Sequence, residues 1–346
     1  MIEYLVMSVE RQQIEESSRF KKDFKGQVVA AGIRLAAPIL RHGTERVMRN
    51  LDVKYEDGFD DQIRSFAKDG KLFLLVTDHQ SLADTLACFE PADKIREIAN
   101  LPGYFLPYTM TLATGDKGAD TKGLQDVQAQ TLDEHFINRV FLSRSSDQKN
   151  FNTKANLRGV RDEIKDYLLQ GFGGIIHAEG NLNAAREKGV TEAVHNSPFR
   201  NFVTMFQSER KRLSIERNGM QPFERNSLRS IINLADEEGL DISIVPITTS
   251  GTYNIYDPST GTLTRSAIRT GFHLADQSLA KVFVSNPMDI NEGELGEIIR
   301  RHKRMTKEDW DEFNAIVAKK IASHLPNKMR GIYRTDTNSF EPIKTD

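Results

Sequence analysis

A histidine and an aspartate separated by four residues form the stretch of this sequence best suited to chemistry. His79 and Asp84 lie in LFLLVTDHQSLADTLA, residues 72–87, which begins as a buried-type strand and continues with helical spacing. Five residues on one helix turn through about 500°, so the two side chains would not share a helical face. With His79 in the loop after the strand and Asp84 in the first turn of the next helix, the carboxylate reaches one imidazole nitrogen. The other nitrogen is then free to act as a general base.

The spacing of His79 and Asp84 alone is weak evidence, because it also arises by chance and a loop histidine often makes only surface hydrogen bonds. Four sequence blocks in a characteristic order support a functional role for this pair. The blocks are His79–Asp84, Phe141–Arg144, Ile176–Gly180, and Val245–Ile247 with Ser250–Gly251. Through these blocks, over roughly residues 70–325, the sequence resembles the glycerolipid acyltransferases, the family of glycerol-3-phosphate and lysophosphatidate acyltransferases. The stretch 281–290 is also similar to the family's late strand.

The resemblance implies a reaction and the residues that carry it. A fatty acyl group would pass from acyl-CoA or acyl carrier protein to a hydroxyl of glycerol 3-phosphate or 1-acylglycerol 3-phosphate, in phospholipid biosynthesis. His79 would take the hydroxyl proton, Asp84 would stabilise the imidazolium, and no acyl-enzyme, metal or cofactor is implied. The implied acceptor-binding residues are Ser81, Arg144, Glu179, Gly180, Arg186 and Pro246.

Two positions depart from the family's pattern. The residue before the histidine is usually asparagine and is Asp78 here, which adds a second carboxylate beside the base. The third block usually continues with Thr-Arg, whereas Asn181 and Leu182 follow here and the next arginine is Arg186. The orienting partner of the histidine and the identity of the acceptor therefore stay open.

Structural and functional alternatives remain beside this interpretation. Arg144 is equally explained as a solvated residue at a strand end, Glu179 with Gly180 as a turn, and Pro246 as a residue that shapes a strand edge or its exit. Cys88 shares the helical face of Asp84, but a small core residue is the favoured role. Two rival functions are a thioester hydrolase in which His79 activates water, and a non-catalytic lipid-binding protein on the same scaffold.

The elements that must position these residues indicate an α/β fold, with a mixed, mostly parallel sheet flanked by helices. Short apolar runs at 72–76, 140–142, 174–176, 242–247 and 281–284 predict strands. Helical spacing predicts helices over 156–169, stopped by Gly171, and over 307–325, stopped by Pro326. We expect a helical N-terminal segment over 1–65, an acyltransferase-like domain over 66–330 with a basic helical insertion at about 185–240, and a tail over 331–346.

Composition narrows the class of protein. The 346 residues carry a formal net charge of -2, which argues against a nucleic-acid-binding surface, and the single cysteine excludes a disulfide framework and multi-cysteine metal sites. A reducing compartment such as the cytoplasm fits best, since neither a signal peptide nor a membrane span is recognised. Residues 199–229 hold seven Lys/Arg and three Asp/Glu. This segment is either a solvated helical face or a peripheral contact with anionic lipid through Arg210, Lys211 and Arg212.

Overall fold

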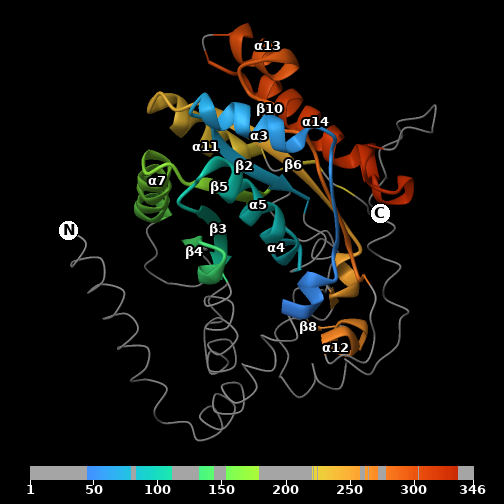
Figure 1. Ribbon diagram of the computed structural model, residues 1–346. Helices are drawn as coiled ribbons and strands as arrows, with labels where there is room; N and C mark the ends of the chain where they lie inside the picture. Colours follow the sequence, from blue (N-terminus) through green and yellow to red (C-terminus); the bar gives the residue numbers. More distant parts are fainter. Residues whose placement is uncertain are drawn as a thin grey trace, which may run out of the picture.

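An α/β fold underlies the part of the chain that the computed structural model describes. The described residues are 45–78, 83–110, 132–143, 153–178, 220, 222–223, 225–257, 262–263, 265–271, 278–302 and 304–333. Within them, eight strands form a mostly parallel mixed sheet flanked by helices (Figure 1). The predicted fold class is confirmed.

The strands and helices have the following bounds. The sheet consists of β1 (Asp52–Tyr55), β2 (Leu72–Thr77), β3 (Tyr104–Met110), β4 (Ile137–Ser143), β5 (Gly173–His177), β6 (Ile242–Ser250), β9 (Lys281–Val284) and β10 (Met288–Asp289). A separate two-stranded pair is β7 (Tyr256–Asp257) with β8 (Thr262–Leu263). The α-helices are α3 (Phe59–Lys68), α4 (Asp84–Ala87), α5 (Phe89–Ala99), α7 (Thr153–Leu169), α11 (Arg225–Glu237), α12 (Arg265–Gly271), α13 (Gly293–Arg301) and α14 (Lys307–Ser323). Short 3₁₀ turns are η4 (Thr252–Asn254), η5 (Asn327–Met329) and η6 (Gly331–Tyr333).

The sheet brings the ends of its central strands together. The strand order is β1-β9-β6-β2-β5-β3-β4, and β10 also pairs with β6. Strand β2 runs parallel to both neighbours, with Thr77 opposite His177 of β5 and Ile247 of β6. Strands β3 and β4 continue the parallel arrangement. The edge at which β2, β5, β6, β3 and β4 end is called the carboxyl edge below.

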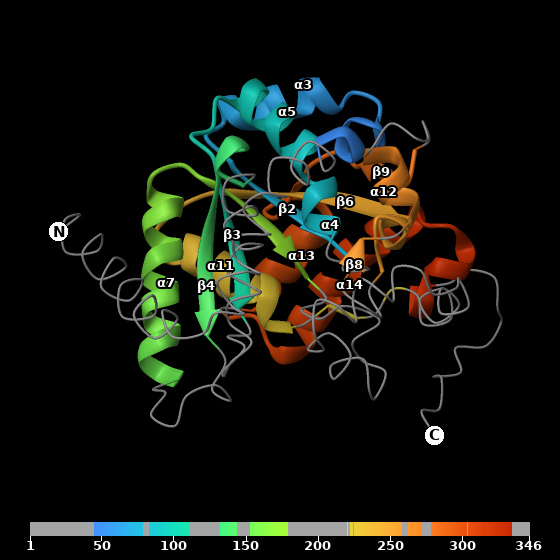
Figure 2. The same cartoon turned by 90° about the horizontal axis from the view of Figure 1, so that it is seen from below.

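Helices cover both faces of this sheet, giving three layers (Figure 2). Strand β2 is buried along its whole length, which explains its continuous apolar run. Its even positions, Leu74 and Val76, pack with α7, α11, α13 and α14, whereas Phe73 and Leu75 pack with α3 and α5. Side chains alternate between the two faces of a strand, so successive residues of β6 also face the two helix layers in turn.

Two predicted helices are confirmed, although α7 starts three residues earlier and α14 ends two residues earlier than predicted. Helix α7 spans Thr153–Leu169 and is followed by Gly171 at φ 82, a left-handed position that glycine adopts without strain. Helix α14 buries Trp310, Phe313 and Val317 and ends before Pro326. Its start is a capping box in which Thr306 and Asp309 satisfy each other's backbone N–H groups.

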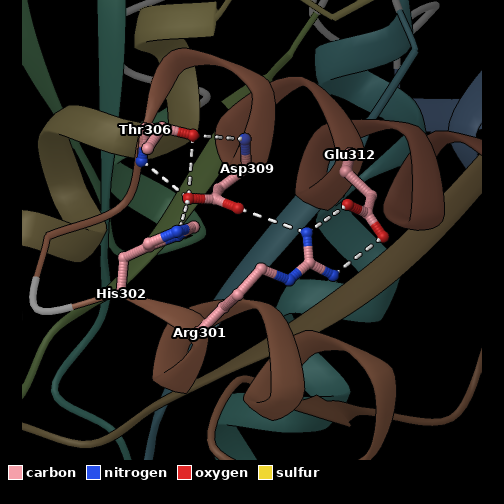
Figure 3. A network of polar contacts seen from close by, with 5 residues as sticks. All are labelled: Arg301, His302, Thr306, Asp309 and Glu312. Atoms are coloured by element: carbon pink, nitrogen blue, oxygen red, sulfur yellow. Dashed lines mark hydrogen bonds and ion pairs between the residues drawn. The ribbon is translucent and has the colours of Figure 1, made fainter.

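Charged groups from α13 surround this capping box (Figure 3). The Arg301 guanidinium lies 3.2 Å from Asp309 Oδ1 and 2.7 Å from Glu312 Oε2. His302 Nδ1 lies 2.9 Å from Asp309 Oδ2. These five residues, including Thr306, are called the α13–α14 network below. It joins the two helices at the start of α14.

The expected helical N-terminal segment is wrong at one place. Residues 45–49 and α3 are helical, but Asp52–Tyr55 form β1, an edge strand parallel to β9. Val53 and Tyr55 pack against the layer that contains α3 and α5. The four residues are too few to show strand periodicity, and their partner strand lies far later in the sequence, so local pattern does not reveal them. Residues 1–44 lie outside the described part.

None of the described helices combines the length and the hydrophobicity that a membrane crossing requires.

Candidate active site

Asp84 and Pro246 are the predicted site residues that the structure describes. The other predicted site residues lie outside the described ranges: His79, Ser81, Arg144, Glu179, Gly180 and Arg186. Arg210, Lys211 and Arg212, the expected lipid-contact residues, lie outside them as well.

The described strands end next to three of these positions. Strand β2 ends at Thr77, two residues before His79, and β5 ends at His177, two residues before Glu179. Strand β4 ends at Ser143, directly before Arg144. All three strands point the same way in the sheet, so the chain leaves each of them at the carboxyl edge. Open α/β sheets place their binding sites outside this edge.

Asp84 occupies the position that the sequence predicts, in the first turn of the helix after β2. It is the first residue of α4 and is 0% exposed. The hydroxyl of Thr249, near the end of β6, lies 3.1 Å from Asp84 Oδ1. Thr249 shares a face of β6 with Val245 and Ile247, which point toward the layer of α3 and α5. Two elements far apart in sequence therefore hold this carboxyl group.

Asp78 lies against the same threonine. It follows β2 directly and is 0% exposed. Its Oδ1 atom is 3.0 Å from Thr249 Oγ1, 3.4 Å from Thr249 N and 3.2 Å from Thr77 Oγ1. The second carboxyl group that the sequence adds at position 78 is thus joined to Asp84 through one hydroxyl. Asp78 and Asp84, which Thr249 connects, are called the carboxyl pair below.

Cys88 is buried beside the carboxyl pair. It connects α4 to α5 and is 0% exposed. Burial raises the pKa of its thiol, and the nearby carboxyl groups of Asp84 and Asp78 raise it further. A thiol held in this protonated form is a poor nucleophile, so Cys88 is a core residue, as the sequence favours.

His177 is an imidazole at the carboxyl edge that the structure describes. It is the last residue of β5, and its Nε2 atom lies 2.9 Å from the hydroxyl of Thr85. Thr85 is the neighbour of Asp84 on α4, so this contact connects β5 to the helix that carries the predicted orienting residue. The sequence reasoning gave His177 no role in the acyltransferase site. Its place at the end of a strand, two residues before Glu179, is a signal that could have identified it.

Pro246 does not shape a strand edge or a strand exit. It lies buried inside β6, opposite Val76 of the neighbouring β2. On the other side of β6, β10 pairs with Ser243 and Ile244 and β9 pairs from Ile247 onward. Pro246 therefore falls where β6 changes partner, a place at which a missing N–H is tolerated. Its carbonyl still accepts a hydrogen bond from Ser285 N at 2.9 Å.

Thr249 is another residue of this region that sequence reasoning missed. The fourth block brackets it between Ile247 and Ser250, but a threonine in a strand is usually only a good strand former. Its role depends on the parallel register of β2 and β6, in which position 249 is two residues beyond the partner of Thr77. Among the described residues, no group of three or more His, Cys, Asp or Glu side chains is arranged to hold a metal ion.

No family model matches the chain, and no curated protein matches it significantly. The resemblance to acyltransferases therefore rests on the motif blocks alone.

Proposed function

We propose that the chain is an O-acyltransferase that moves a fatty acyl group from an acyl thioester to a hydroxyl of glycerol 3-phosphate or 1-acylglycerol 3-phosphate. The observation that supports this most is the placement of Asp84. It is a fully buried carboxyl group on the first turn of the helix that follows β2, held by a hydrogen bond at the carboxyl edge. The proposed base, His79, lies five residues earlier in the chain.

Burial makes such a carboxylate effective as a partner for a histidine. A carboxylate in the interior interacts more strongly with a nearby positive charge than one in water, because the local dielectric constant is lower. Burying a carboxyl group is also unfavourable unless hydrogen bonds or charges compensate for the lost hydration. Thr249 supplies one such bond, and a developing imidazolium on His79 would supply a charge during the reaction.

In the proposed mechanism the proton and the acyl group move in opposite directions. His79 removes the proton from the acceptor hydroxyl as the oxygen attacks the thioester carbonyl, and Asp84 stabilises the imidazolium. The tetrahedral intermediate then expels the thiolate, which takes the proton from His79 to leave as the free thiol. Positioned proton transfer of this kind contributes on the order of 10²–10⁴-fold to the rate.

The strand order sets a condition on acceptor binding. Strand β4, which ends directly before Arg144, is separated from β2 by β5 and β3. Three strand spacings of ~4.8 Å place the two strand ends about 14 Å apart. An acceptor with its phosphate on Arg144 and its hydroxyl at His79 must bridge this gap together with the arginine side chain. Strand β5, which Glu179 and Gly180 follow in the sequence, lies between these two strands in the order of the sheet.

The proposal includes two kinds of partner. The acyl donor is acyl-CoA or acyl carrier protein, and the basic residues Arg210, Lys211 and Arg212 make a peripheral contact with anionic lipid. Such a contact brings a water-borne donor and a membrane-bound product together. Because it is electrostatic, it weakens as ionic strength rises.

An acceptor-dependence assay tests the proposed function. The protein is incubated with palmitoyl-CoA in the presence and absence of glycerol 3-phosphate or its 1-acyl derivative, while free thiol and ester product are measured. We expect thiol release that depends on an acceptor and equals ester formation. His79→Ala should lower this rate by on the order of 10²–10⁴-fold.

Two other outcomes identify the rival functions. Equal thiol release with and without an acceptor, and no ester, would identify a thioester hydrolase. No turnover of palmitoyl-CoA or of palmitoyl carrier protein by the wild-type protein, with thioester binding retained, would identify a non-catalytic lipid-binding protein. Either result contradicts the proposed transfer reaction.

A further inference from the structure

The helix that carries Asp84 is short and has no side-chain cap. Helix α4 spans four residues, Asp84–Ala87, and the residue at its start, Ala83, offers no side-chain hydrogen bond to the first turn. A helix of this length is not stable in isolation, because forming one turn orders several residues for few hydrogen bonds. Alanine is also a poor residue at the start of a helix. The position of Asp84 must therefore be set by contacts with other elements.

Two such contacts come from opposite sides of β2. Thr249 of β6 lies 3.1 Å from Asp84 Oδ1, and His177 Nε2 of β5 lies 2.9 Å from the hydroxyl of Thr85. Strand β2 lies between β5 and β6 in the sheet. Consecutive residues of a helix point about 100° apart, so Asp84 and Thr85 can each face a different neighbouring strand. The first turn of α4 is therefore attached to the strands on both sides of β2.

The sheet fixes the place of His177. Its backbone lies opposite Thr77, the last residue of β2, and the N–H of the next residue, Ala178, donates to the Thr77 carbonyl at 3.1 Å. A side chain on a strand is a more precise support than one on a loop. A threonine hydroxyl both donates and accepts, so its bond to the imidazole forms with either tautomer of the ring.

We propose that His177 is a positioning residue, which through Thr85 holds α4 against the end of β5 and thereby fixes Asp84. Thr249 fixes Asp84 from the side of β6, and His177 fixes the neighbouring residue from the side of β5. A displacement of about 1 Å can lower a catalysed rate on the order of 10²-fold, so a second support benefits the reaction. The role of Asp84 in that reaction rests on the proposed function. The attachment of α4 to β5 does not, because it follows from the contact itself.

Amide hydrogen exchange tests the attachment without any assay of activity. The amides of Ala87 and Cys88 donate to the carbonyls of Ala83 and Thr85 in the single turn of α4. Local opening of this turn exposes both amides to water. The loss of one supporting hydrogen bond should make them exchange about 2- to 10-fold faster. We expect this result in His177→Phe, which keeps a ring of similar size, and in Thr85→Val.

Three further variants make this measurement specific. The double variant of His177→Phe and Thr85→Val should exchange about as fast as the single variants, because both substitutions break the same contact. His177→Gln should restore slow exchange, since the side-chain amide that it introduces can bond to Thr85. Thr248→Val is the matched control. The Thr248 hydroxyl donates at 2.8 Å to the Ile321 carbonyl on α14, in the other layer, so exchange in α4 should stay unchanged.

Three results of the exchange experiment would overturn the attachment. The first is unchanged exchange of Ala87 and Cys88 in both single variants. The second is a double variant whose acceleration is the product of the two single effects, because the residues would then act separately. The third is an equal acceleration by Thr248→Val. If His177→Phe does not fold, Thr85→Val decides alone, since this substitution keeps the shape of a partly exposed side chain.

Steady-state kinetics tests whether the attachment positions Asp84 for the reaction. Thr85→Val and His177→Phe should lower kcat for ester formation about tenfold, with KM for the acceptor changed less than about twofold, and His177→Gln should restore kcat. A raised KM with unchanged kcat would assign His177 to acceptor binding and overturn the positioning role. A wild-type protein without transfer activity would refute the proposed function and this role together, while the exchange of α4 still decides the attachment.

Discussion

Two regions of this protein place an aspartate in a buried polar cluster, and they differ in what holds it. In the α13–α14 network, Asp309 accepts hydrogen bonds from Thr306 N at 2.8 Å and from the Thr306 hydroxyl at 2.9 Å (Figure 3). It also contacts two basic side chains, Arg301 and His302. In the carboxyl pair, the described hydrogen bonds to the two aspartates come from threonine hydroxyls and one backbone N–H.

This difference separates a structural carboxylate from one suited to chemistry. The hydrogen bond from the Thr306 backbone, followed by those from its hydroxyl and from His302, lowers the pKa of Asp309 to about 2. Its charge is thus stabilised within the fold, where it starts α14 and attaches it to α13. The carboxyl pair brings two acids together in the interior beside the ends of β2 and β6, at the edge where open α/β sheets place their binding sites. The hydrogen-bond partners of a buried carboxyl group therefore say more about its role than its burial does.

Replacing Asp84 should have the largest effect on activity and should distinguish the carboxyl pair most clearly from the α13–α14 network. Asp84→Asn keeps the shape of the side chain but removes the charge that stabilises the imidazolium of His79. We expect kcat for acyl transfer to fall on the order of 10²–10⁴-fold, as measured by ester formation from palmitoyl-CoA.

Asp309→Asn is the matched change in the other region. It should lower the midpoint of urea unfolding, because the capping box and the contact with Arg301 are weakened, and it should leave kcat unchanged while the protein is folded. A loss of activity from Asp309→Asn as large as that from Asp84→Asn would remove the distinction between the two regions.

A smaller effect is expected when the cap of α14 is removed. Thr306→Ala should reduce the free energy of unfolding by about 1 kcal/mol at neutral pH. The pKa of Asp309 is lowered from 3.8 to about 2, so its contribution is complete above pH 3.8 and is lost as the pH falls toward 2. The difference between wild type and variant should therefore shrink over this range. A difference that stays constant from pH 7 to 2 would show that Asp309 does not act with Thr306.

The strands and helices that local pattern predicts are those with strong signals of their own. The apolar runs identify β2, β4, β5, β6 and β9, and regular helical spacing identifies α7 and α14. Local pattern does not predict β3, because Pro107 interrupts its run. In the sheet, β5 pairs only with the first two residues of β3, so Pro107 lies beyond that ladder. Edge strand β1 gives no local signal either, because its pairing with β9 is entirely long-range.

For the site, too, the sequence predicts the local features but not the long-range contacts. Sequence order and helical geometry predict the place of Asp84 on α4, because both depend on a few neighbouring residues. The contact between Asp84 and Thr249 could not be predicted, since it requires the register of β2 against β6. Asp78 could be recognised as a second carboxylate beside the base, but its connection to Asp84 emerges only when β6 supplies the threonine between them.

A double-mutant cycle on the proposed base and its partner is the most direct test of the site. The rates of ester formation are compared for the wild type, His79→Ala, Asp84→Asn and the double variant. If Asp84 acts only through His79, the double variant should be no slower than His79→Ala alone. If the two losses multiply, the residues act independently, and the central claim that they form one catalytic unit is contradicted.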